Sequence, residues 1–97
     1  MYKANLIAVT PAGSVPDDLR PFVDFKASLK GVQLKRTQLI AIFLVETTEC
    51  YIPIFLDRGT TVQAVKEELA AQEAEMDSAT EKVIENALAD LPSEKKK

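Results

Sequence analysis

The sequence contains no histidine and only one cysteine, Cys50, among its 97 residues. A single cysteine cannot form an internal disulfide, and it rules out the zinc sites that several cysteines build. Without histidine, the chain also lacks the side chain that most often acts as a general base near neutral pH. Cys50 would share one strand face with Ile52, Ile54 and Leu56, so we interpret it as a packed hydrophobic residue. These absences predict a protein that is not an enzyme and that uses no metal or other cofactor.

Long hydrophobic runs are also missing. The apolar stretches at 6–9, 39–45 and 50–56 are far shorter than the roughly 20 residues of a membrane-spanning helix. The first of them is too short for the core of a secretory signal, and Pro11 follows it closely. We therefore expect a cytoplasmic protein that does not engage a membrane.

The charge is unevenly distributed along the chain. Residues 1–60 carry seven Lys and Arg against six Asp and Glu, whereas residues 61–97 carry five against nine. An acidic half repels phosphate backbones, which disfavours nucleic-acid binding in general. It would suit a basic protein partner, although an acidic helix is more often simply solvated.

Length and composition indicate one small domain. Hydrophobic residues make up 46% and charged residues 28% of the sequence, a normal globular mixture. We assign residues 1–91 to a single domain and residues 92–97, which follow the last apolar position, to a mobile charged tail. Residues 11–21 contain three prolines and are expected to form a loop.

Alternating and apolar segments predict the strands. Residues 2–10 alternate, and the run of seven apolar residues at 39–45 is rich in β-branched side chains. Residues 46–49 form a plausible hairpin loop, and the chain would return as a strand at 50–56. Pro53 lacks an amide hydrogen, so this returning strand should lie at a sheet edge.

Residues 22–30 fit two patterns. As a helix, the segment would follow Pro21 and stop at Gly31, with an apolar stripe formed by Phe22, Phe25 and Leu29. As a strand, it would alternate strictly between apolar and polar residues over eight positions. The alternation is the stronger pattern, so we predict a strand, with the helix as the alternative.

The C-terminal third predicts helices. Thr60 and Gln63 have the spacing of a capping box, and an apolar stripe follows them. Ser78 and Glu81 repeat that spacing, which favours a second helix to about Leu91, although one bent helix over 62–91 is nearly as plausible. Strands first and helices last indicate an α+β fold: an antiparallel sheet of three to four strands with one or two C-terminal helices packed on one face.

The run at 39–45 is apolar on both of its faces. A two-layer α+β domain covers one face of its sheet, so the second face needs another cover: the final helix, the Pro-rich loop or another molecule. We therefore predict a homodimer or a tight hetero-complex in which Ile40, Ile42 and Leu44 contact the partner.

A second candidate surface is basic. Lys26, Lys30, Lys35 and Arg36 form the one concentration of positive charge, and Lys35 and Arg36 are the predicted contact residues. A solvated face is the commoner meaning of such a cluster. The sequence thus favours a non-enzymatic protein-interaction module, acting through the apolar sheet face and an acidic C-terminal helix. The alternative is a small-ligand or nucleic-acid-binding protein that uses the Lys26–Arg36 region.

Overall fold

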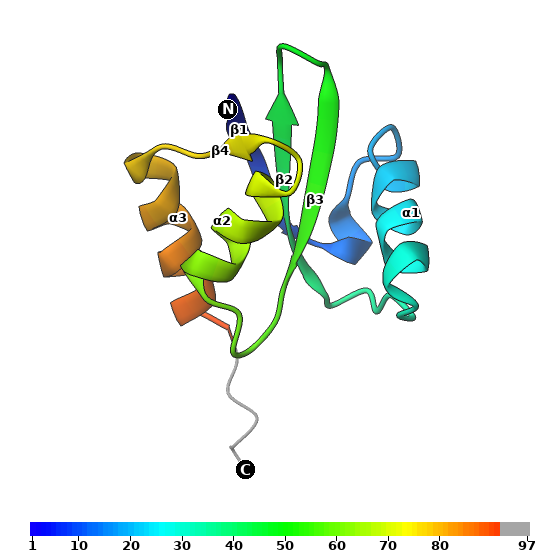
Figure 1. The fold of residues 1–97 in the computed structure, drawn as a ribbon. Helices are drawn as coiled ribbons and strands as arrows, with labels where there is room; N and C mark the ends of the chain where they lie inside the picture. Colours follow the sequence, from blue (N-terminus) through cyan, green and yellow to red (C-terminus); the bar gives the residue numbers. More distant parts are fainter. Residues whose placement is uncertain (92–97) are drawn as a thin grey trace.

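A four-stranded sheet with helices on both faces organises the computed structural model, which describes residues 1–91 (Figure 1). The predicted tail at 92–97 lies outside the described residues. The predicted α+β class is confirmed. Along the chain the elements are β1 (Tyr2–Pro11), the 3-10 turn η1 (Ala12–Ser14), α1 (Arg20–Lys30), β2 (Leu39–Val45), β3 (Cys50–Leu56), α2 (Val62–Ala70), β4 (Ala74–Glu75) and α3 (Ser78–Ala89).

The strands lie in the order β3-β2-β1-β4. β2 pairs antiparallel with both β1 and β3, and β3 is an edge strand, as Pro53 predicted. The expectation of a purely antiparallel sheet was wrong, because β4 runs parallel to β1. β4 has only two residues and follows a turn in which the carbonyl of Glu73 accepts the amide hydrogen of Tyr2 at 2.7 Å.

The strand predicted at 22–30 was wrong, because this segment is the helix α1. Gly31 ends the helix in the left-handed region with φ of 68°, and the amide of Val32 donates back to the carbonyl of Ala27 at 3.1 Å. This is the Schellman arrangement that glycine permits. A strand would have placed Phe25 on the same side as Ala27, whereas the helix exposes the first and buries the second.

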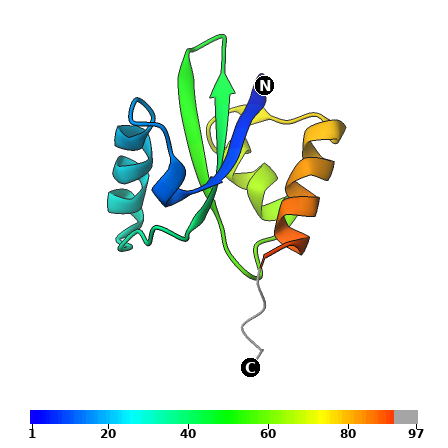
Figure 2. The ribbon, with the colours of Figure 1, turned by 180° about the vertical axis from the view of Figure 1, so that it is seen from behind.

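α1 covers the sheet face that was predicted to contact a partner. Figures 1 and 2 show α1 on one side of the sheet and α2 and α3 on the other. The core beneath α1 joins residues of the helix, the preceding loop and two strands: Ala12, Val15, Leu19, Val23, Ala27, Ile40, Ile42 and Phe55. The two-faced hydrophobicity of β2 is therefore explained within one chain, because the sheet is the middle of three layers.

The opposite face carries a second core under α2 and α3, centred on Phe43, Ile54, Leu69 and Ile84. The two helices are separate, as favoured, and the single bent helix is excluded by β4 between them. Both predicted caps are wrong by one residue. Thr61 caps α2 by accepting the amide hydrogen of Ala64, and Asp77 caps α3 by accepting that of Thr80.

Candidate functional site

The outer side of α1 carries three exposed large apolar side chains. Phe22, Phe25 and Leu29 retain 44%, 66% and 69% of their accessible surface. Their spacing places them along one line of the helix, away from the buried Val23 and Ala27. We call these three residues the α1 stripe. α1 is thus apolar on two sides, and only one of them packs on the sheet.

The stripe continues onto the edge strand. The rings of Phe22 and Tyr51 lie 5.2 Å apart between centroids, tilted by 53°. Tyr51 is half-buried and lies opposite Leu44 in the register of β3 and β2. Neighbours in adjacent strands share a face of the sheet, so Leu44 adjoins the same apolar surface.

An ion pair flanks the stripe on the side of β3. Lys26 of α1 and Glu68 of α2 approach to 3.3 Å, and their side chains are only 18% and 31% exposed. Because α1 and α2 lie on opposite faces of the sheet, this pair passes the edge strand and connects the two helix layers. It helps to hold α1, and therefore the stripe, in a fixed position.

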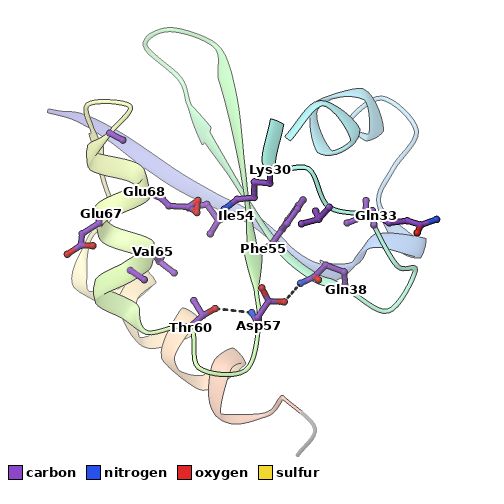
Figure 3. A pocket seen from close by; sticks show the side chains of 14 residues that line it. Lys30, Gln33, Gln38, Ile54, Phe55, Asp57, Thr60, Val65, Glu67 and Glu68 are labelled. Atoms are coloured by element: carbon purple, nitrogen blue, oxygen red, sulfur yellow. Dashed lines mark hydrogen bonds between the residues drawn. The ribbon is translucent and has the colours of Figure 1, made fainter. Parts of the chain in front are cut away.

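Next to this ion pair lies a groove of about 850 Å³ between the C-terminal end of α1, β3 and α2. Figure 3 shows Lys30 reaching toward it from α1 and Glu68 from α2, with Ile54 and Phe55 of β3 between them. Opposite charges and apolar side chains line the same groove. Such a mixture fits a polypeptide surface better than one small charged ligand.

The polar groups at the lower end of this groove are largely paired with each other. Gln38 donates through Nε2 to a carboxylate oxygen of Asp57 at 3.0 Å. The hydroxyl of Thr60 accepts the amide hydrogen of Asp57, also at 3.0 Å (Figure 3). These contacts stabilise the turn that follows β3.

The structure divides the predicted basic region. Lys26 and Lys30 lie on the groove side of α1, whereas Lys35 and Arg36 line a separate hollow of about 290 Å³. Arg20 of α1 lines the same hollow, although the charge pattern did not indicate that it belongs there. The side chain of Arg36 lies against Gly13, where a Cβ atom would be only 3.2 Å from Nε. We call Arg20, Lys35 and Arg36 the basic hollow.

The apolar residues predicted to contact a partner occupy different environments. Ile40 and Ile42 are 0% and 1% exposed beneath α1. The expectation that they form an open face was therefore wrong, because α1 occupies that face. Leu44 is half-buried and keeps some surface beside Tyr51. Ile40 and Ile42 instead pack beneath α1. The exposed apolar surface on this side of the molecule is the stripe on the outer side of that helix.

Cys50 is exposed, which corrects its interpretation as a packed residue. It begins β3 at the hairpin, which in Figure 1 extends beyond the helices that cover the sheet. Its thiol lies 3.6 Å from the carbonyl oxygen of Thr48. Within residues 1–91, no group of three or more acidic or sulfur side chains could hold a metal ion. None of the helices in this part of the chain is long and apolar enough to cross a membrane.

Sequence reasoning missed the α1 stripe because it preferred the strand at 22–30. The signal was present in the helix alternative, whose apolar stripe consists of the same three residues. That alternative assigned the stripe no role. The helix packs through Leu19, Val23 and Ala27 instead, spaced four residues apart, and leaves the larger side chains outside.

Comparison with known proteins gives a family but no activity. The chain is 26% identical over 84 residues to the "Uncharacterized protein MJ0858" of Methanocaldococcus jannaschii, which covers 86% of this chain and 74% of that protein. No solved structure matches the chain. A family model described as "Domain of unknown function (DUF749)" matches residues 2–88. With nearly the whole described chain matched, the protein belongs to the DUF749 family.

Proposed function

We propose that this protein is a small, non-enzymatic protein-interaction module that binds its partner on the α1 stripe and the adjoining groove. The observation that carries the proposal is the exposure of Phe22, Phe25 and Leu29 in one line on an outward-facing helix. Large apolar side chains that gather on a surface mark interaction sites more often than scattered ones do.

The composition of the stripe supports this proposal. Aromatic side chains supply much of the binding energy at protein interfaces, and a polar rim usually surrounds them. Here Asp24, Lys26 and Lys30 lie on the same helix as the stripe. A partner that buried Phe25 would therefore meet apolar surface in the middle and charges around it.

The rigidity of α1 supports it further. The helix is packed on the sheet through Val23 and Ala27 and is linked to α2 by the Lys26–Glu68 ion pair. Because a preformed surface loses little conformational freedom on binding, more of the contact energy appears as affinity. The acidic C-terminal half would give the partner a favourable approach if that partner is basic. A cytoplasmic location belongs to the same proposal and rests on the sequence alone.

Site-specific photo-crosslinking in an extract of the source organism tests the proposal. A photoreactive phenylalanine analogue at Phe25 should yield a discrete protein adduct. The same analogue at Val83, an exposed apolar residue of α3, is the matched control and should yield none. Adducts of equal pattern from both positions, or none from Phe25, would contradict a docking role for the stripe.

A second candidate function follows from the basic hollow. The fold brings Arg20 to Lys35 and Arg36 around a concave surface, which favours binding of an anionic group. Asp24 lines the same hollow and reduces its positive charge. For this reason we rank anion binding below docking on the stripe.

A further inference from the structure

Resting on the proposed function, we infer that the partner on the α1 stripe is a second copy of this chain. Two α1 helices would pack antiparallel about a two-fold axis that passes close to Phe25. Such an interface uses the same surface patch on both subunits, which is the commonest arrangement among homo-oligomers.

The spacing of the stripe fits this arrangement. In an antiparallel pair centred near Phe25, the Phe22 side chain of one subunit faces Leu29 of the other. The two Phe25 side chains then meet at the axis. Each large apolar group is covered by another one, and none is left opposite a charge. Two copies therefore bury each other's apolar side chains, and no other partner is needed to remove the stripe from water.

The charges at the two ends of α1 favour the antiparallel direction. Asp17 and Asp18 are exposed just before the helix, and Lys30 lies in its last turn. Asp17 pairs with Arg20 of its own chain at 3.9 Å, so the net negative charge of this end comes from Asp18. An antiparallel pair places the acidic end of one helix beside the basic end of the other, whereas a parallel pair would place like charges together. The helix dipoles also oppose each other in the antiparallel pair. Lys26, near the axis, already has Glu68 as its partner.

The size of the stripe sets the strength of the dimer. With side chains of about 200 Å² each, the exposed fractions leave roughly 350 Å² of apolar area per subunit. Tyr51 and the charged rim add to this area, but the total lies below the roughly 800 Å² per partner of standard stable interfaces. We therefore expect a reversible dimer with a Kd on the order of micromolar.

Sedimentation velocity of the purified chain, from about 1 µM to about 500 µM, tests the inference. The expected result is a shift from monomer to dimer within this range. Phe25→Asp should weaken the dimer by about 100-fold or more, because it places two carboxylates at the axis. Val83→Asp changes an exposed residue of α3 in the same way and should leave the Kd unchanged. Thermal melting of both variants shows whether each one still folds.

A charge exchange tests the direction of packing. Asp18→Lys should weaken the dimer by about tenfold, since the two-fold axis repeats each contact. Adding Lys30→Glu to that variant should restore most of the affinity. Restoration supports the antiparallel pair, and further weakening would overturn it.

The outcomes separate this inference from the function on which it rests. A chain that stays monomeric at all concentrations, yet crosslinks through Phe25 to a different protein in the extract, overturns the second copy and leaves the interaction module standing. A monomer without any Phe25 adduct overturns both. A dimer that Phe25→Asp does not weaken places the interface elsewhere and also overturns the inference.

Discussion

Lys26 on α1 and Glu68 on α2 form an ion pair, 3.3 Å between Nζ and Oε1, that connects helices on opposite faces of the sheet. The contact passes the edge strand β3 close to the groove. Both side chains are partly shielded from water, so the pair should contribute more than a fully exposed one. It also contributes a geometric constraint, because it joins α1 to α2 across the edge of the sheet.

A double-mutant cycle measures this contribution. We expect Lys26→Ala and Glu68→Ala to show a coupling of about 0.5–1 kcal/mol in the free energy of unfolding. The more exposed pair Lys66–Glu81, which joins α2 to α3 at 3.6 Å, is the internal control and should couple less. Urea denaturation of the four variants of each cycle gives the values. Equal coupling in both cycles would contradict a special role for the contact across the edge.

The structure changes the expected effect of a substitution at Ile42. On an open sheet face, Ile42→Glu would only dissociate a complex. Beneath α1 it buries an unpaired carboxylate, which should cost several kcal/mol and unfold a domain of ordinary stability. Leu44→Glu, at a half-buried position of the same strand, should leave the domain folded. Circular dichroism shows whether each variant folds. A folded Ile42→Glu protein would contradict the finding that α1 covers this residue.

Asp77 gives the stability a dependence on pH. Its pKa lies below the ordinary value of 3.8, first because the backbone amide of Thr80 donates to the carboxylate, and also through the Thr80 side chain and Lys3. A carboxyl whose pKa is lower in the folded state stabilises the fold above its unfolded pKa. That contribution disappears as the pH falls through the folded value.

Asp77→Ala should therefore lower the melting temperature at pH 7, and the difference from the parent should shrink as the pH falls below 3.8. Asp77→Asn can still cap α3 but cannot titrate, so it should retain much of the stability at neutral pH. Melting curves of the three proteins across the acidic range provide the comparison. A difference between parent and Asp77→Ala that stays constant with pH would argue against the charged cap.

The basic hollow makes a separate prediction about anions. If Arg20, Lys35 and Arg36 act together, inorganic phosphate should shift the amide resonances of residues 12–13 and 35–36 in an NMR titration. Lys35→Glu with Arg36→Glu should abolish these shifts and flatten their dependence on salt. The melting temperature should change little, because exposed charges contribute little to stability. Lys82→Glu on α3 is the control, and loss of the shifts in that variant would show that only net charge matters.

The sequence by itself determined the elements whose signals are local and unambiguous. The strands predicted at 39–45 and 50–56 are β2 and β3 with the same bounds, because a continuous apolar run and a short polar turn permit few other structures. Pro53 fixed the position of β3 at the edge, since a residue without an amide hydrogen does not fit an inner strand. The break near residue 77 was also correct.

Only the tertiary structure decided the elements whose local signals conflict or are too short. Residues 22–30 alternate like a strand, but the helix is the form that seals the second sheet face with Val23 and Ala27. β4 has only two residues, which is too short for any sequence pattern to predict a strand. It forms because the edge of β1 is free to pair with it.

The candidate sites follow the same rule. The α1 stripe and the basic hollow depend on which side of α1 is buried and on what the loop at 31–38 brings alongside it. The periodicity of a helix shows which of its sides are apolar. It does not show which of two apolar sides the sheet will cover. That choice depends on the fit of side chains from segments far apart in the sequence, and smaller residues at 23 and 27 allow the closer approach.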